Sequence, residues 1–209
     1  MQIRRTVALM AASALGISAL AACSSSTDSA PSPGQSVSTA PMTQGSPTDI
    51  AFAQSMIPHH QQAIEMADLA LDPQAGASPQ VQQLARQIKA AQDPEIEQMT
   101  QWLQAWGAPA AMPGVSDASA VAGMDHSGHD MGGMTMSGMM TAEQMQELEQ
   151  ARGTDFDQMW LTMMIAHHEG AISMAQQAQA SNSSQVTTLT DAIITGQQQE
   201  ITTMQQLLD

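Results

Sequence analysis

The sequence predicts an all-α protein whose folded part is a four-helix bundle built from two repeated αα-hairpins. An internal repeat, an apolar period of 3.6 residues in each repeated segment, and breakers between the segments of each half all point to this fold. Phe52 to Ala67 recurs at Trp160 to Ala175 with an offset of 108 residues, and Val81 to Met99 recurs at Val186 to Met204 with an offset of 105. Because one hairpin alone would leave its apolar face in water, the two hairpins are expected to pack together.

Each half is predicted to be a helix carrying a His pair, a turn, and a second helix carrying a Gln-x-x-Glu-Ile motif. The turns fall at residues 72–79 and 181–184, where Asp, Pro, Ser and Asn gather. Pro58 directly precedes the first His pair, whereas the second half has Ala166 at that place. Two interpretations are open: Pro58 kinks a continuous first helix, or the helix begins at Pro58.

The N-terminus resembles a secretory signal of the lipoprotein type. Arg4 and Arg5 precede an apolar run that ends in Leu-Ala-Ala-Cys23. This pattern implies that residues 1–22 are removed and that Cys23 carries a lipid; the alternative is an uncleaved N-terminal anchor. We therefore expect a membrane-anchored protein on the extracytoplasmic face, either periplasmic or at the cell surface.

Composition sets the remaining boundaries and excludes some functions. Residues 23–48 are predicted to be a disordered tether, 49–106 and 141–209 the two hairpins of one bundle domain (49–209), and 107–140 a Met/His/Gly-rich connecting loop.

Lys and Arg total 5 against 20 Asp and Glu, which disfavours nucleic-acid binding. With 1 Cys and 19 Met, a soft-metal site would use thioether sulfur and imidazole nitrogen, the donors that suit copper.

Polar residues fall inside the apolar stripes of the predicted helices. Gln92 and Glu95 share a stripe with core residues, as do Gln197 and Glu200 in the other half, and both His pairs straddle such stripes. A buried carboxylate needs a charged or hydrogen-bonded partner, which a His or a His-bound metal could supply. The layer is thus either a metal site or a purely structural His–Glu layer. The candidate ligands are His59, His60, His167, His168, Met56, Met163, Met164, Glu95 and Glu200; core packing is favoured for Met66, Met99, Met174 and Met204.

The connecting loop is the second candidate metal site. Residues 124–140 hold six Met and two His on a glycine-interrupted backbone that cannot form a core. Thioethers prefer Cu(I), and imidazoles also suit Cu(II). A low-complexity linker with incidental Met, or the lining of a hydrophobic partner site, are the alternatives. The candidate ligands are Met124, His126, His129, Met131, Met134, Met136, Met139 and Met140.

The doubled Met-x-x-His-His-x-x-Ala-Ile-x-Met-Ala motif, followed in each half by Gln-x-x-Glu-Ile-x-x-Met, resembles the domain of unknown function 305 family over about residues 49–209. The resemblance implies a ferritin-like four-helix fold in secreted or lipid-anchored bacterial proteins, some members being associated with copper binding or tolerance. It places the family's His motif on His59, His60, His167 and His168, and its Glu motif on Glu95 and Glu200.

The favoured function is extracytoplasmic copper buffering, tolerance or transfer, with metal ions and another metal-handling protein as partners and no organic cofactor. One alternative is a ferritin-like metal-ion oxidase, although the Glu-x-x-His pattern of di-iron bundles is absent from the sequence. The other is a non-catalytic envelope protein in which the His–Glu layer is structural. No catalytic residue is assigned.

Overall fold

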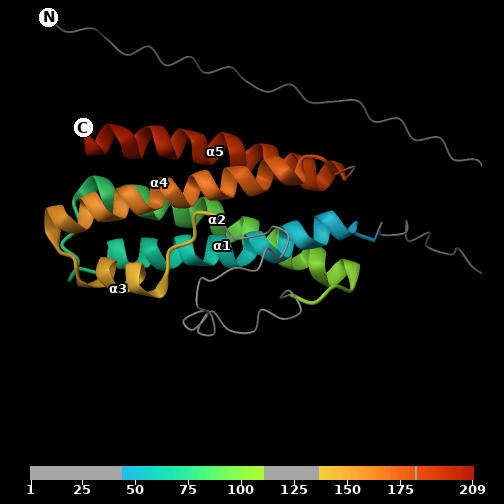
Figure 1. Ribbon diagram of the computed structural model, residues 1–209, viewed down its shortest axis with the longest axis horizontal. Helices are drawn as coiled ribbons and strands as arrows, with labels where there is room; N and C mark the ends of the chain where they lie inside the picture. The colour runs from blue at the N-terminus through green and yellow to red at the C-terminus, as the bar shows by residue number, and fades with distance from the viewer. Residues whose placement is uncertain (1–43, 111–136, 182) are drawn as a thin grey trace, which may run out of the picture. The chain divides into compact units, whose positions relative to one another are not determined.

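The computed structural model describes residues 44–110, 137–181 and 183–209, and within these ranges all regular structure is α-helical. The helices are α1 (Pro47–Leu71), α2 (Pro79–Trp106), α3 (Ala142–Gln150), α4 (Gly153–Ala178) and α5 (Ser184–Leu208). The four long helices lie side by side as a bundle (Figure 1). The predicted all-α bundle is therefore confirmed, whereas the short helix α3 is an addition that the repeat did not predict.

Local sequence signals explain where the helices begin and end. Ser46 and Thr141 cap α1 and α3 through reciprocal capping boxes, and Ser78 caps α2. Helix α2 ends at Trp106 and is capped by Gly107, whose φ of 67° is the left-handed conformation that terminates helices. Pro58 lies inside α1, so the alternative that the helix begins at Pro58 is wrong.

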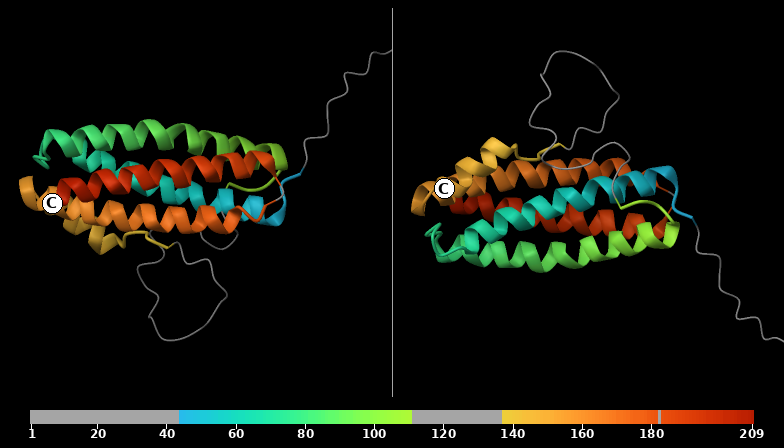
Figure 2. Two further views of the ribbon diagram at one scale, coloured as in Figure 1. Left: turned by 90° about the horizontal axis from the view of Figure 1, so that it is seen from above. Right: turned by 90° about the horizontal axis from the view of Figure 1, so that it is seen from below.

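Two hairpins form the bundle, as Figure 2 shows from both sides: α1 packs against α2, α4 packs against α5, and α1 and α4 join the two halves. The indole Nε1 of Trp160 donates to the backbone carbonyl of Met66 at 2.8 Å, while His59 contacts His167. The residue numbers rise on one helix as they fall on the other, so α1 and α4 run antiparallel.

The apolar core is divided into two clusters with the buried histidines between them along α1 and α4. One cluster includes Met66, Ile88 and Trp160, and the other includes Phe52 and Ile193. The core interpretation of three methionines is confirmed, because Met66, Met99 and Met204 are fully buried, whereas Met174 is half-buried against the second cluster. No helix in the described ranges has the length and apolarity needed to cross a bilayer.

Candidate metal site

Four histidines from two helices form a buried layer in the middle of the bundle. The helical period of α1 and α4 turns both His pairs inward, and His59, His60, His167 and His168 are each at most 1% exposed. The rings of His59 and His167 meet across the α1–α4 contact, with centroids 3.8 Å apart and planes tilted by 45°. We call these four residues the histidine layer.

Two of the histidines are bonded to the glutamates of the second helix in their own half. His60 Nε2 lies 2.7 Å from Glu95 Oε2, and His168 Nε2 lies 2.8 Å from Glu200 Oε2. An ionised carboxylate can only accept a hydrogen bond, so the ring nitrogen donates in both pairs. In the neutral ring this leaves the Nδ1 lone pair on the opposite side, and both Nδ1 atoms are buried without a hydrogen-bond partner.

The other two histidines are held in the neutral form. Burial lowers the pKa of His59 to about 4, with the nearby His60 and His168 acting in the same direction and the Ser137 carbonyl opposing. Burial also lowers the pKa of His167 well below its usual 6.5, reinforced by the neighbouring histidines and opposed by the backbone of His59. Neutral imidazole is the form that binds a metal ion.

The end of the connecting loop lies across the histidine layer. The Ser137 carbonyl accepts from His59 Nε2 at 3.0 Å. The Gln62 amide clamps the Met140 backbone with two hydrogen bonds, accepting from its N–H at 2.7 Å and donating to its carbonyl at 2.8 Å. We call residues 137–140 the strap. It makes the two halves unequal, because the neighbour of His59 has no counterpart at His167.

Sequence reasoning missed the strap, although a signal was present. Gln62 and Gly170 occupy equivalent places in the repeat, two residues after each His pair. A Cβ on Gly170 would overlap the Ser137 carbonyl and approach Gly138 Cα to 2.9 Å. The glycine in the middle of α4 is therefore the place where the strap backbone meets the helix, and its equivalent Gln62 holds the same strap from α1.

Buried polar atoms without a hydrogen-bond partner gather at this layer. In the described ranges, every such side-chain atom belongs to three repeat-equivalent pairs of residues. The atoms are Nδ1 of His59, His60, His167 and His168, Nε2 of His167, Oε1 and Nε2 of Gln92, and Oε1 of Gln197. A buried polar group without a hydrogen bond costs about 1–3 kcal/mol. In the described ranges, this cost falls entirely on the six residues that carry these atoms.

The remaining predicted ligands fall into three groups. Met56 and Met164 are fully buried on the same helices as the His pairs, and Met163 is half-buried at the edge of the core. Met139 and Met140 are half-buried in the strap. The others lie outside the described residues: Met124, His126, His129, Met131, Met134 and Met136. The predicted lipidation site, Cys23, lies outside them as well.

The carboxylates and imidazoles do not by themselves form a preassembled cage. Among the described residues, no three His, Cys, Asp or Glu side chains are grouped as a metal site. Both glutamates are already hydrogen-bonded to the Nε2 atoms of His60 and His168. A metal at this layer would therefore need further donors, and the available ones are thioethers and amides.

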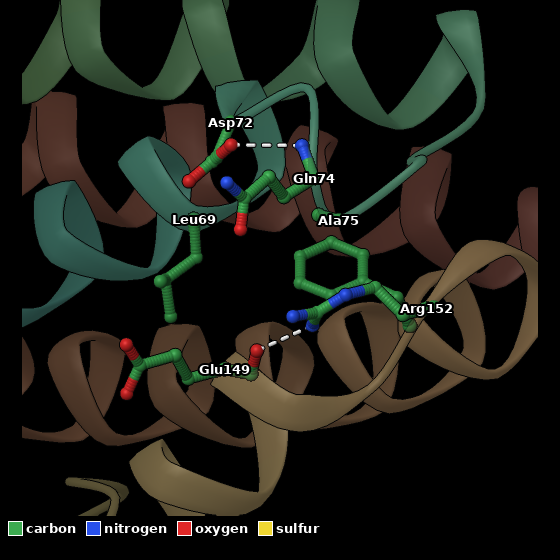
Figure 3. A pocket seen from close by; sticks show the side chains of 7 residues that line it. Leu69, Asp72, Gln74, Ala75, Glu149 and Arg152 are labelled. Atoms are coloured by element: carbon green, nitrogen blue, oxygen red, sulfur yellow. Dashed lines mark hydrogen bonds between the residues drawn. The ribbon is translucent and has the colours of Figure 1, made fainter.

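A separate small pocket lies at the α1–α2 turn and the start of α4 (Figure 3). Its volume is about 80 Å³, and Asp72, Glu149 and Arg152 are its charged lining residues. The Arg152 guanidinium donates to backbone carbonyls of its own segment, Glu149 and Ala151. No residue of the histidine layer lines this pocket, so it is not part of the candidate site.

Comparison with known proteins identifies the family. The family model "Domain of unknown function (DUF305)" matches residues 49–208. The chain belongs to the DUF305 family. This membership confirms the resemblance carried by the doubled His motif. No curated protein matches the chain.

Solved structures of DUF305 proteins share the fold. A DUF305 fragment from Deinococcus radiodurans is 27% identical, covering 78% of this chain and 97% of that one, with a TM-score of 0.64. A DUF305 protein from Streptomyces coelicolor, predicted to be secreted, is 27% identical over 77% of this chain and 91% of its own, with a TM-score of 0.65. CopM in its Cu(II)-bound form is 33% identical over 77% and 95%, with a TM-score of 0.58. CopM is also known in Cu(I)-bound and silver-bound forms.

Proposed function

We propose that this DUF305 protein binds copper ions outside the cytoplasm and serves to buffer or transfer them. The observation that carries the proposal is the concentration of unpartnered buried polar atoms at the histidine layer. Copper suits the donors present, because imidazole binds both oxidation states and thioether favours Cu(I). The copper-bound and silver-bound forms of CopM support the same metal class.

The residues around three of the four imidazoles fit a metal-binding role. Metal-binding histidines usually donate their second ring N–H to a carboxylate or a carbonyl, which fixes the tautomer and raises the basicity of the ligating nitrogen. Glu95 does this for His60, Glu200 for His168, and the Ser137 carbonyl for His59. The Nδ1 atoms are then the ligating atoms, with Met56 and Met164 as the nearest thioethers along the helices. A bound copper ion would accept these lone pairs and so give the buried Nδ1 atoms a partner.

Residues 124–140 of the connecting loop are proposed as the second copper site, and Cys23 as the lipid attachment point. In this arrangement the loop captures Cu(I), and the strap joins the loop to the buried layer. The neighbour from Streptomyces coelicolor, predicted to be secreted, supports an extracytoplasmic location. The transfer partner would be another extracytoplasmic copper-handling protein.

A purely structural His–Glu layer is the competing function. The two His–Glu pairs are compatible with it, because each satisfies one buried ring nitrogen. The other eight buried atoms count against it, since a layer built only for stability would leave no such cost. The copper-binding function and the structural function are therefore distinguished by whether metal binding depends on the histidine layer.

The test is an anaerobic Cu(I) titration of the mature chain, carrying Cys23→Ser, against a chromogenic chelator. One variant lacks residues 124–136, which leaves the strap in place, and a second carries Glu95→Gln and Glu200→Gln. Exposed Asp191→Asn on α5 is the matched control for loss of a carboxylate. Loss of one class of site in each variant, with the glutamate variant weakened about 10–100-fold, supports the proposal. Binding no tighter than the chelator in the parent protein would contradict it.

A further inference from the structure

Two buried glutamines on the helices that carry Glu95 and Glu200 lack a full set of hydrogen bonds. Gln92 is 2% exposed and neither atom of its amide has a partner; Gln197 is 4% exposed and its Oε1 has none. They occupy equivalent places in the two halves, with an offset of 105 residues. The same unusual feature in both halves indicates a shared role for the two amides.

Helix geometry places each amide next to a His–Glu pair. Gln92 precedes Glu95 by three residues on α2, and Gln197 precedes Glu200 by three on α5, so each pair shares one helix face with Cβ atoms about 5–6 Å apart. The glutamates contact His60 and His168 directly. Each amide thus lies about one helical turn from the glutamate that bonds a histidine of the layer.

The donor chemistry around the layer is short of oxygen. Cu(I) and Ag(I) are satisfied by imidazole and thioether, whereas Cu(II) favours tetragonal sets of nitrogen and oxygen donors. The glutamates are already bonded to imidazole, and no third His, Asp or Glu joins the group within the described ranges. The unpartnered buried side-chain oxygens of these ranges are those of Gln92 and Gln197 alone.

Resting on the proposed copper function, we propose that Gln92 and Gln197 determine which oxidation state the histidine layer accepts. Their amide oxygens, bound to the metal directly or through a water molecule, supply the hard donors that Cu(II) needs. Cu(I) and Ag(I) bind through nitrogen and sulfur and do not depend on them. The two amides are thus specificity-determining residues of the layer.

Replacing these glutamines should change two quantities differently: the stability of the metal-free protein and its affinity for Cu(II). Replacing a buried, unpartnered amide with an apolar side chain of similar size removes a desolvation cost, so the metal-free protein should be as stable or more stable. The same substitution removes an oxygen donor, so Cu(II) binding should weaken. If the glutamines served only in packing, their replacement would not weaken Cu(II) binding while leaving the stability unchanged or higher.

The experiment compares Gln92→Leu/Gln197→Leu with Gln87→Leu/Gln199→Leu, which makes the same change at exposed positions of the same two helices. All proteins are mature chains carrying Cys23→Ser, His126→Ala and His129→Ala, so that neither the thiol nor the loop imidazoles compete for the metal. Affinities for Cu(II), Cu(I) and Ag(I) are measured by chelator competition, and the Cu(II) environment by electron paramagnetic resonance. The urea midpoint of the metal-free protein is measured in parallel.

We expect Cu(II) affinity to fall at least about tenfold in the buried variant, with a changed resonance spectrum and with Cu(I) and Ag(I) affinities held within about threefold. The urea midpoint should not fall, and the exposed variant should match its parent in metal binding. Gln92→Met/Gln197→Met, which keeps the unbranched shape but replaces oxygen with sulfur, should lose Cu(II) while keeping Cu(I).

Three results would overturn the inference. An equal loss of Cu(I) and Cu(II) would mean that the amides support the layer only structurally. Unchanged Cu(II) binding in both buried variants would show that copper uses other donors, and would leave the proposed copper function intact. Failure of the parent to bind either ion would remove the copper function and this inference together.

Discussion

The backbone of Gly170 on α4 packs directly against the backbone of Ser137 in the strap, leaving no room for a Cβ at position 170. This contact brings the Ser137 carbonyl to His59 Nε2, where it accepts a hydrogen bond. A glycine in a helix interior costs about 1 kcal/mol relative to alanine, so its presence here indicates that the strap contact outweighs that cost. The hydrogen bond of one histidine therefore depends on the absence of a side chain on another helix.

Gly170→Ala should displace the strap. The added methyl overlaps Ser137 and destabilises the folded protein by about 1–3 kcal/mol, despite the gain in helix propensity. Nitrogen NMR of the metal-free protein should show that the His59 Nε2 proton loses its protection from exchange. Gly196→Ala on α5 is the control, because nothing lies within 4 Å of its added Cβ, and it should stabilise by up to about 1 kcal/mol. Similar stabilisation by both substitutions would refute the strap contact.

Stability should fall between about pH 6.5 and pH 4. The unfolded chain takes up a proton at His59 near the ordinary pKa of 6.5, whereas the folded protein resists protonation until about pH 4. His59 alone should therefore remove about 2 kcal/mol of the free energy of unfolding at pH 5 relative to pH 7.5, and the lowered pKa of His167 acts in the same direction.

Urea unfolding of the metal-free protein at pH 7.5 and pH 5 measures this loss. His59→Gln should reduce the difference between the two pH values, since glutamine does not titrate. An identical free energy of unfolding at both pH values would show that the folded protein protonates His59 as readily as the unfolded chain does.

Trp160→Phe tests the contact that fixes α4 against α1. It removes the hydrogen bond from the indole to the Met66 carbonyl and leaves a space in a fully buried site, so the free energy of unfolding should fall by about 1–3 kcal/mol. Phe52 occupies the equivalent place in the first half, so the substitution gives both halves the same residue at this position. The half-buried Trp106→Phe should cost less than Trp160→Phe, and a reversed order would contradict the packing described for α4.

Much of the fold follows from the sequence, because the repeat is encoded in local patterns. The spacing of Leu84, Ile88 and Met99 predicts a helix and its buried face, and all three are buried. The helix α3 was not predicted because it has no counterpart in the first half. Leu148 is its one buried residue, and Met145 packs against the same core cluster. Patterns within one segment carry no information about contacts with a segment outside the repeat.

The candidate site was predicted only in part for the same reason. The inward placement of His60 and Glu95 follows from the helical period, and their contact follows from packing the two helices of one hairpin. The strap contact at His59 joins residues separated by 78 positions through an irregular segment, which no periodicity predicts. The asymmetry between His59 and His167 is thus a tertiary property, invisible in a repeat that treats them as equivalent.

Pro58→Ala should stabilise the protein. Proline within a helix cannot donate to the carbonyl four residues earlier and its ring crowds that carbonyl, a cost of about 3 kcal/mol, which greater freedom of the unfolded chain offsets by about 0.4–1 kcal/mol. Pro58 lies in the middle of α1, and Ala166 fills the equivalent place in α4. We expect a net gain of about 1–3 kcal/mol in urea unfolding, and a loss of at least about 3 kcal/mol for the reciprocal Ala166→Pro. If Pro58→Ala instead destabilised the protein, the packing of His59 and His60 would have to depend on the helix shape that the proline imposes. A copper titration of that variant would then show whether the same shape is needed for metal binding.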